Sequence, residues 1–213
     1  MNNFKDFADA HSVSRETIAR LELYVETLKD WNNRHNLVAP ATLEEVWTRH
    51  ILDSAQLLPF IPASAKTLAD LGSGAGFPGL VLALLLEGRV QVNLFEATRK
   101  KCDFLAAAAE KMALTVSVRN ERIEASPCAV FDVVTSRACA PLPKLLGYAS
   151  RCIGPESLCL FLKGENYAAE VTDAQRFWRM TLATHASQTH KSGIILAISQ
   201  LKPHKPSFGP TPR

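Results

Sequence analysis

One stretch constrains the fold of this 213-residue chain more than any other, because glycines stand at alternate positions directly after a short apolar run. Residues 67–71 read as a buried strand, and an apolar helical stretch begins near residue 79. Between them stand Gly72, Gly74 and Gly76. Glycine lets the backbone turn sharply at positive φ and lets a ligand lie against the main chain without meeting a Cβ atom. This strand-to-helix turn therefore predicts a site for a nucleotide-like cofactor.

Two kinds of cofactor site use such a turn, and the register of the glycines separates them. Residues 74–79 satisfy the dinucleotide fingerprint G-x-G-x-x-G, and an acid, Glu96, lies about 20 residues further on. The glycine run begins earlier, however, at Gly72, and Asp70 precedes it at the end of the strand. This Asp-x-Gly-x-Gly-x-Gly pattern resembles motif I of class I S-adenosylmethionine-dependent methyltransferases. S-adenosylmethionine carries an ammonium and a sulfonium, which a carboxylate facing the ligand favours. A turn with no ligand is the alternative.

The remainder of the chain predicts an α/β fold. It is 47% hydrophobic, enough to bury a large core. From Lys66 onward, short apolar runs alternate with helical stretches, which predicts a doubly wound, mostly parallel, Rossmann-like sheet of seven strands with helices on both faces. The expected strands are 67–71, 90–95, 115–118, 130–135, 158–163, one near 181, and 194–199. We expect a catalytic domain over 63–201, a helical extension over 1–62 packed on it, and a disordered Pro-rich tail over 202–213.

Two helices are expected in the N-terminal extension. Ser14 is a suitable N-cap for a first helix, whose apolar residues recur with a period near 3.6. Thr42, with Glu45 three residues later, predicts the N-cap of a second helix that continues to Leu52.

Charge and cysteine content narrow the class of protein. The net charge is only +3, but no acidic residue follows Asp173, so the basic C-terminal part indicates either an anionic partner or a solvated tail. The five cysteines lack C-x-x-C spacing, so neither a disulfide framework nor a zinc site is indicated. The first residues lack the apolar core of a signal peptide, and the apolar run 80–86 is too short to span a bilayer. We therefore expect a cytoplasmic protein without a membrane partner.

Polar residues follow several predicted strands, where ligands of doubly wound sheets bind. Glu96 can accept both hydroxyls of a cofactor ribose, or it can cap the next helix. Residues 122–124 could flank an adenine ring, although this signal is weak by itself. Arg137 offers a planar donor for a carbonyl, carboxylate or phosphate, unless it pairs with Asp132 or a C-terminal carbonyl. Lys163 is either one more cation of the site or a solvated helix-cap residue.

The loop after the fourth strand excludes two methylation chemistries. Residues 132–142 contain no Asn/Asp-Pro-Pro-aromatic sequence, which methyltransferases of exocyclic amines need to hold the amine. Cys139 lacks the flanking pair expected of the nucleophile that attacks carbon-5 of pyrimidines, and Cys128 precedes the strand.

From Leu28 to Ser199 the chain resembles the RsmG family, the ribosomal RNA small-subunit methyltransferase G, also called glucose-inhibited division protein B. The resemblance lies in Trp31-Asn32 with Asn36-Leu37, in the blocks 47–54, 70–79 and 98–105, and in Ser136-Arg137-Ala138 with Lys163-Gly164. It implies transfer of a methyl group from S-adenosylmethionine to N7 of guanine 527, in the 530 loop of 16S rRNA. Guanine N7 is a lone-pair nucleophile without a proton, so we expect no general base and no catalytic residue. We also expect no metal.

The resemblance also implies site residues. Positions that contact the cofactor in the family are Gly72, Phe77, Ile123, Glu124 and Arg137, and the class I pattern adds Asp70, Gly74 and Glu96. Candidates for contact with rRNA, through bases or phosphates, are Arg99, Lys100, Lys101 and Lys163, together with Arg137.

His50 and Asp53 share a helix face, and we expect a buried hydrogen-bonded pair that locks the N-terminal helices to the domain, with contact to RNA as the alternative. We expect a monomer. The rival functions are a non-catalytic rRNA-binding protein that retained the fold and, less favoured, a nicotinamide-dinucleotide oxidoreductase.

Overall fold

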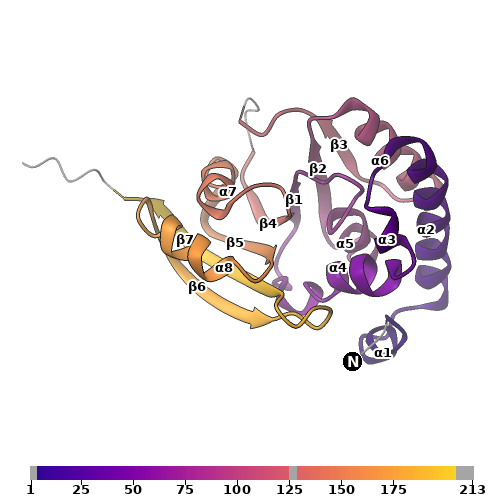
Figure 1. Cartoon of the computed structure of the whole chain (residues 1–213), viewed down its shortest axis with the longest axis horizontal. Coiled ribbons are helices and arrows are strands. Elements are labelled where there is room, and N and C mark those ends of the chain that lie inside the picture. The colour runs from indigo at the N-terminus through magenta and orange to yellow at the C-terminus, as the bar shows by residue number, and fades with distance from the viewer. Residues whose placement is uncertain (1–3, 125–128, 205–213) are drawn as a thin grey trace, which may run out of the picture.

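A seven-stranded sheet forms the centre of the molecule (Figure 1). The computed structural model describes residues 4–124 and 129–204. The strand order is β3-β2-β1-β4-β5-β7-β6, with β1 to β5 parallel and β7 antiparallel to both of its neighbours. This confirms the predicted fold class. The strands are β1 (Thr67–Leu71), β2 (Gln91–Glu96), β3 (Ser117–Asn120), β4 (Phe131–Arg137), β5 (Ile153–Lys163), β6 (Trp178–Ala186) and β7 (Ile194–Pro203).

The order of the strands reverses between β1 and β4. From β1 the chain continues outward to β2 and β3, whereas β4 lies on the other side of β1 and leads to β5. In open α/β sheets, ligands bind outside the carboxyl ends of the strands at such a switch point. The glycine turn after β1 and Arg137 at the end of β4 therefore lie where a ligand is expected.

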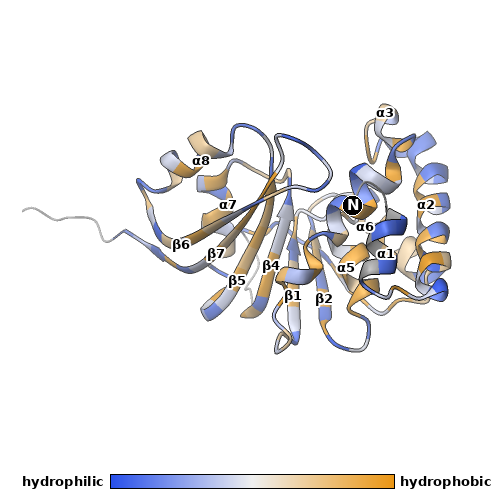
Figure 2. Cartoon of the chain, turned by 90° about the horizontal axis from the view of Figure 1, so that it is seen from below, coloured by the Kyte–Doolittle hydropathy of each residue, from blue (hydrophilic) through white to orange (hydrophobic). Residues whose placement is uncertain are grey.

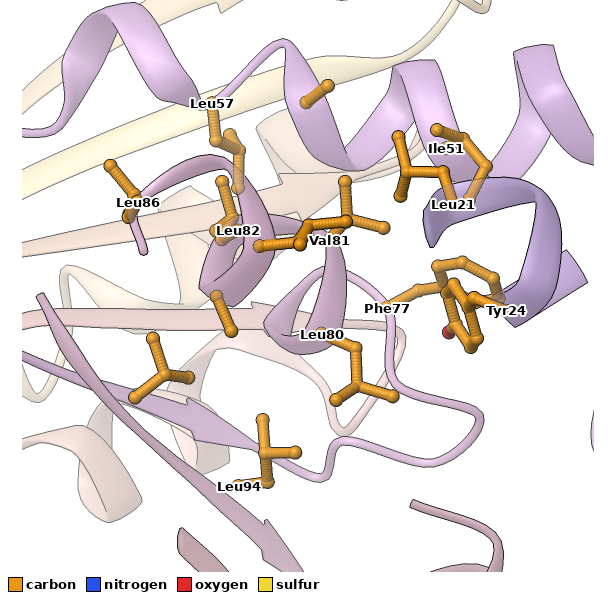
Figure 3. Packing of buried hydrophobic residues seen from close by; sticks show 14 of the residues in the cluster. Leu21, Tyr24, Ile51, Leu57, Phe77, Leu80, Val81, Leu82, Leu86 and Leu94 are labelled. Atoms are coloured by element: carbon orange, nitrogen blue, oxygen red, sulfur yellow. The ribbon is translucent and has the colours of Figure 1, made fainter. Parts of the chain in front are cut away.

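Two apolar clusters cover the two faces of the sheet. One packs α2 (Arg15–His35), α5 (Gly79–Leu85) and α6 (Arg99–Lys111) against it; the other contains side chains of α7 (Leu142–Ala149) and α8 (Tyr167–Ala174). Figure 2 shows that the central strands are mostly hydrophobic, as strands buried on both faces must be. In the first cluster, the ring of Tyr24 lies 5.3 Å from that of Phe77, beside Leu80 (Figure 3). The Tyr24 hydroxyl donates to the carbonyl of Ala75, so α2 is bonded to the glycine turn itself.

The N-terminal segment confirms one predicted cap and corrects another. Helix α2 follows a short α1 (Phe4–Ala10), and the Ser14 hydroxyl accepts from the Thr17 amide at 3.0 Å, as an N-cap should. The predicted second helix is broken into shorter pieces, and its N-cap is not Thr42 but Ala39, because Pro40 occupies the first helical turn. The pieces are α3 (Pro40–Leu43), a π-helix η1 (Trp47–Leu52), α4 (Asp53–Ala55) and a 3-10 turn η2 (Leu58–Phe60).

The C-terminal boundary and one cysteine also differ from expectation. Strand β7 extends through Pro203, which pairs with Trp178 of β6, so the predicted tail cannot begin at residue 202. Residues 205–213 of that tail lie outside the described part of the chain. Cys152 is disulfide-bonded, contrary to the expectation for the cysteines, while Cys102, Cys139 and Cys159 are free thiols. Among the described residues, no helix has the length and apolarity needed to cross a membrane.

Candidate functional site

Two cavities adjoin at the carboxyl ends of the strands. The first, which we call the glycine-loop pocket, has a volume of about 360 Å³. The second, the arginine pocket, has a volume of about 410 Å³. Ala138, directly after β4, lines both. The glycine-loop pocket is lined by Gly72, Gly74, 95–97, 121–124, 138–140, Lys101, Lys144 and Tyr148. The arginine pocket is lined by Thr42, Arg49, His50, Asp53, Arg137, Ala138, 162–164, Glu170, Ser187, Thr189, His190, Gly193 and Ile194.

The glycines of the loop are required for conformation and for close packing. Gly72, Gly74 and Gly76 have φ of +71°, +56° and +89°, which L side chains rarely adopt. A Cβ atom on Gly72 would lie 2.5 Å from the Cys139 sulfur. At Gly74 the nearest atom is the carbonyl oxygen of Gly72 at 3.7 Å, so the main chain at Gly74 borders open space. The loop thus presents main chain to the pocket.

Glu96 is held in place at the wall of the glycine-loop pocket. Its side chain is buried, yet it lines the cavity. One carboxylate oxygen accepts from the Gly74 amide at 3.0 Å and the other from the Thr98 amide at 2.7 Å. Since Thr98 precedes α6, Glu96 joins the loop to the start of that helix while each oxygen keeps a lone pair for a hydroxyl group.

Asp70 lies behind the glycine loop and not on the wall of either cavity. It is 1% exposed, and one carboxylate oxygen accepts from the Thr135 hydroxyl at 2.8 Å. The other oxygen lies against Gly79, where a Cβ atom would come within 2.7 Å, and has no hydrogen-bond partner among the described residues. Burial raises the pKa of Asp70 to about 6, and the hydrogen bond from Thr135 opposes this rise. The side chain turns toward β4 and α5, so the expectation that it faces a ligand is wrong for this structure.

Arg137 joins β4 to the N-terminal segment. Its guanidinium donates to the carbonyl of Arg49 at 3.0 Å and forms an ion pair with Asp53 at 3.1 Å. A third hydrogen bond runs to Nδ1 of His50 at 3.0 Å. The alternative pairing with Asp132 is excluded, because that carboxylate accepts from Lys66 and Thr67 at the opposite end of the strands. Both Arg137 and Asp53 are mostly buried, so their bonds are stronger than those of a solvated pair.

His50 and Phe77 form the support on which Arg137 rests. The His50 ring stacks on that of Phe77 at 4.8 Å, and the Arg137 guanidinium lies 5.0 Å from the centre of the Phe77 ring. Because arginine only donates, Nδ1 of His50 accepts and Nε2 carries the proton, which it donates to the Thr42 hydroxyl at 2.9 Å. Desolvation lowers the pKa of His50 to about 4, and the charge of Arg137 adds to this effect. His50 is thus held neutral, with both ring nitrogens engaged.

Asp53 also connects the N-terminal segment to the hairpin between β6 and β7. Its second oxygen accepts from the Thr189 hydroxyl at 2.6 Å and from the Gln56 amide at 2.8 Å. Gln56 in turn accepts from the Gln188 amide at 2.8 Å. His50 and Asp53 were expected to bond to each other; instead their side chains share Arg137, which provides the expected lock between helices and domain.

A second ion pair closes the far side of the arginine pocket. Lys163, at the end of β5, donates to Glu170 of α8 at 2.7 Å and to the carbonyl of Ala140 at 2.8 Å. The same oxygen of Glu170 accepts from the Leu142 amide at 2.6 Å. The side chain of Lys163 is 8% exposed, so Lys163 is a fixed part of the wall and not a solvated cap.

The structure brings together most, but not all, of the predicted site residues. The glycine-loop pocket contains five predicted cofactor contacts, Gly72, Gly74, Glu96, Ile123 and Glu124, and also Lys101, which was predicted to contact RNA. The arginine pocket contains Arg137 and Lys163. Asp70, Phe77, Arg99 and Lys100 line neither, and the last two are exposed on α6.

Sequence reasoning missed the part of the arginine pocket that α8 and the hairpin between β6 and β7 supply, including Glu170, Thr189 and His190. Glu170 follows no strand, and the hairpin residues belong to no motif, so only tertiary contacts reveal them. Within the described ranges 4–124 and 129–204, no group of three His, Cys, Asp or Glu side chains could hold a metal ion.

Comparisons with known proteins bear on the family and the fold of this chain. A family model described as rRNA small subunit methyltransferase G matches residues 17–197. Curated proteins of that name from Paramagnetospirillum magneticum and Rhodospirillum centenum are 45% and 43% identical; the alignments cover 89% and 96% of this chain and 91% and 94% of those proteins.

Similar solved structures include a SAM-dependent methyltransferase from Aquifex aeolicus, with a TM-score of 0.58 and 16% identity over 82% of this chain and 97% of that one. An O-methyltransferase from Bacillus cereus in complex with SAH gives a TM-score of 0.57 and 17% identity, over 83% of this chain and 90% of that one. At these identities the structural likeness shows the fold alone.

Proposed function

The chain belongs to the rRNA small subunit methyltransferase G family, and on that premise we propose that it methylates N7 of a guanine in 16S rRNA, guanine 527 of the 530 loop. It is a methyltransferase that uses S-adenosylmethionine. The small ribosomal subunit is its partner, and we place the reaction in the cytoplasm with the protein as a monomer.

One observation carries this proposal. The glycine-loop pocket and the arginine pocket are separate cavities that share Ala138, so a cofactor and a base can occupy them at once and meet at one residue. A nicotinamide oxidoreductase would need a pyrophosphate site at the start of α5, and there the buried carboxylate of Asp70 lies against Gly79.

The residues of the glycine-loop pocket fit S-adenosylmethionine. When bound, this cofactor supplies an electrophilic methyl group. The main chain at Gly72 and Gly74 gives it room, and the fixed carboxylate of Glu96 can accept its ribose hydroxyls. Ile123 and Glu124 border the same cavity and suit the adenine ring. We assign Asp70 an electrostatic role from behind the loop, and Phe77 the support of Arg137.

The residues of the arginine pocket suit a nucleobase whose reacting atom carries no proton. His50 cannot act as a base, because one ring nitrogen accepts from Arg137 and the other donates to Thr42. Guanine N7 needs none, so the protein contributes alignment and the exclusion of water. We propose that Lys163 contacts the base and that Arg99, Lys100 and Lys101 contact rRNA phosphates.

The test is a labelled-methyl transfer assay with purified protein and small ribosomal subunits from cells that lack the corresponding gene. We expect one methyl group per subunit, which mapping places on N7 of guanine 527. Label on another atom would contradict the proposed chemistry. Binding to subunits without transfer would favour the non-catalytic rRNA-binding protein instead.

A further inference from the structure

The ion pair between Lys163 and Glu170 leaves hydrogen-bonding groups that no described residue uses. Lys163 uses two of its three N–H bonds, toward Ala140 and Glu170, among the residues that the structure describes. In Glu170 one oxygen receives both Lys163 and the Leu142 amide. In the described part of the chain, no hydrogen bond reaches its other oxygen, Oε1, although the side chain is only 28% exposed. One donor and one acceptor are therefore left at the wall of the arginine pocket.

The two groups are held in a fixed order along the loop that follows β4. Ala138 borders both cavities, Lys163 is bonded to Ala140, and Glu170 is bonded to the amide of Leu142. Ala140 also lines the glycine-loop pocket, whereas Leu142 lines neither cavity, so of the two groups it is the ammonium of Lys163 that is bonded to a residue of the cofactor side.

Guanine presents the complementary groups in the same order. Around its ring, N7 is followed by O6, which accepts, and then by N1–H, which donates. Adenine has the opposite pair, an N6 amino group that donates and an N1 atom that accepts. An extruded base is commonly read through hydrogen bonds to its Watson–Crick edge.

We propose that Lys163 and Glu170 together select guanine, with Lys163 donating to O6 and Oε1 of Glu170 accepting from N1–H. This inference rests on the proposed methylation of N7, because N7 must face the cofactor for the order of groups to be fixed. Adenine in that orientation sets its amino group against the ammonium and its N1 lone pair against the carboxylate. Both contacts are then repulsive.

Glu170→Gln tests the acceptor without removing the support. The amide oxygen of the glutamine stays with Lys163 and the Leu142 amide, since two donors meet there. Its amino group then replaces Oε1, so a donor faces N1–H. The matched control is Asp173→Asn on the same helix, which removes one exposed carboxylate that pairs with Arg176.

The substrates are small subunits reconstituted with 16S rRNA that carries either guanine or 2,6-diaminopurine at the target nucleotide. Diaminopurine keeps N7 and the 2-amino group but exchanges O6 and N1–H for an amino group and a bare nitrogen. We expect the native protein to methylate guanine at least ~100-fold faster, because the mismatched base leaves buried polar groups unpaired. Glu170→Gln should reduce the guanine-to-diaminopurine rate ratio at least ~10-fold, and Asp173→Asn should leave it unchanged.

Melting temperature and cofactor affinity, measured in parallel, show whether each variant is folded. An unchanged rate ratio in folded Glu170→Gln, or an equal loss of rate on both bases, overturns the inference. If Glu170→Gln does not fold, Lys163→Met decides, since it removes the donor to O6 and should also lower the ratio. A native protein that methylates N7 of neither base refutes the proposed function itself, whereas failure of the variants alone leaves that function standing.

Discussion

The two cavities differ in how their walls are made. In the glycine-loop pocket, main chain and short segments at the ends of four strands, β1 to β4, supply most of the wall, and Glu96 is fixed by backbone amides. In the arginine pocket, the wall consists of side chains from four distant parts of the chain, within 42–53, 137–138, 162–170 and 187–194. The difference teaches that a local motif can specify the cofactor, whereas the site for the acceptor depends on how the N-terminal segment and the C-terminal hairpin assemble around Arg137.

The largest expected effect comes from Arg137→Lys. Lysine cannot reproduce three hydrogen bonds from one planar group, so Asp53 and His50 lose a shared partner. We expect kcat/KM for methyl transfer to fall ~100-fold through misplacement of the wall, while affinity for S-adenosylmethionine changes less than ~3-fold. Unfolding in urea should show a loss of about 2 kcal/mol.

The control for Arg137→Lys is Arg176→Lys, since Arg176 lines neither cavity and its ion pair with Asp173 is exposed. It should leave both measurements nearly unchanged. A parallel fall of cofactor affinity in Arg137→Lys would mean that the two pockets are not energetically separate.

Gly74→Ala should affect the glycine-loop pocket and not the arginine pocket. Alanine at φ +56° is strained by roughly 1 kcal/mol, and its Cβ atom would enter the space beside the loop. We expect cofactor affinity, measured by calorimetry, to fall ~10-fold or more with that loss of stability.

Gly88→Ala is the control that separates the backbone strain of alanine at positive φ from the entry of its Cβ atom into the pocket. Gly88 has φ +72° and no atom within 4 Å of an added Cβ, so it carries the same strain far from the site. It should lose stability without losing affinity for the cofactor, and equal affinity losses in both variants would refute the role of Gly74 in the pocket wall.

Asp70, behind the glycine loop, and His50, in the wall of the arginine pocket, should make the free energy of unfolding depend on pH with opposite signs. The pKa of Asp70 is raised to about 6, so its burial costs stability as pH rises from about 4 to about 6. The pKa of His50 is lowered to about 4, so its contribution is present above pH 6.5 and is lost as pH falls toward 4. Each contribution is about 3 kcal/mol, and in the native protein they largely cancel.

The variants Asp70→Asn and His50→Gln should separate these two contributions. Relative to the native protein, urea unfolding of Asp70→Asn should gain stability as pH rises through this window, and His50→Gln should gain stability as pH falls. Slopes of the same sign in both variants would contradict the assignment.

The smallest effect is expected at the exposed helix α6. Lys100→Gln should weaken binding to small subunits about 2- to 3-fold and reduce the slope of log affinity against log salt by about one. Lys66→Gln is the matched control, because Lys66 is exposed before β1, at the opposite edge of the sheet. Equal effects in the two variants would show that α6 does not face the RNA.

The glycine loop and the fold were predictable because both depend mainly on residues that are close together in the sequence. Most strands follow from a short apolar run, although β6 was placed only near residue 181, and Glu96 follows from its place at the end of β2. The direction of Asp70 could not be predicted, because it depends on Thr135 of a neighbouring strand. The π-helix η1 was missed for a similar reason: its side chain His50 is bonded to Arg137, which lies 87 residues further along the chain. Glu170 had no signal, since its partners Lys163 and Leu142 meet it only in the folded protein.

The single residue between the cavities, Ala138, has a kinetic consequence. It is exposed, has φ +51°, and is the only described residue that lines both pockets. Because the two pockets share no other lining residue among those described, S-adenosylmethionine and the rRNA base can enter independently of each other. We therefore expect turnover through a ternary complex with no compulsory order of binding, in which spent cofactor can be exchanged while the ribosomal particle remains bound.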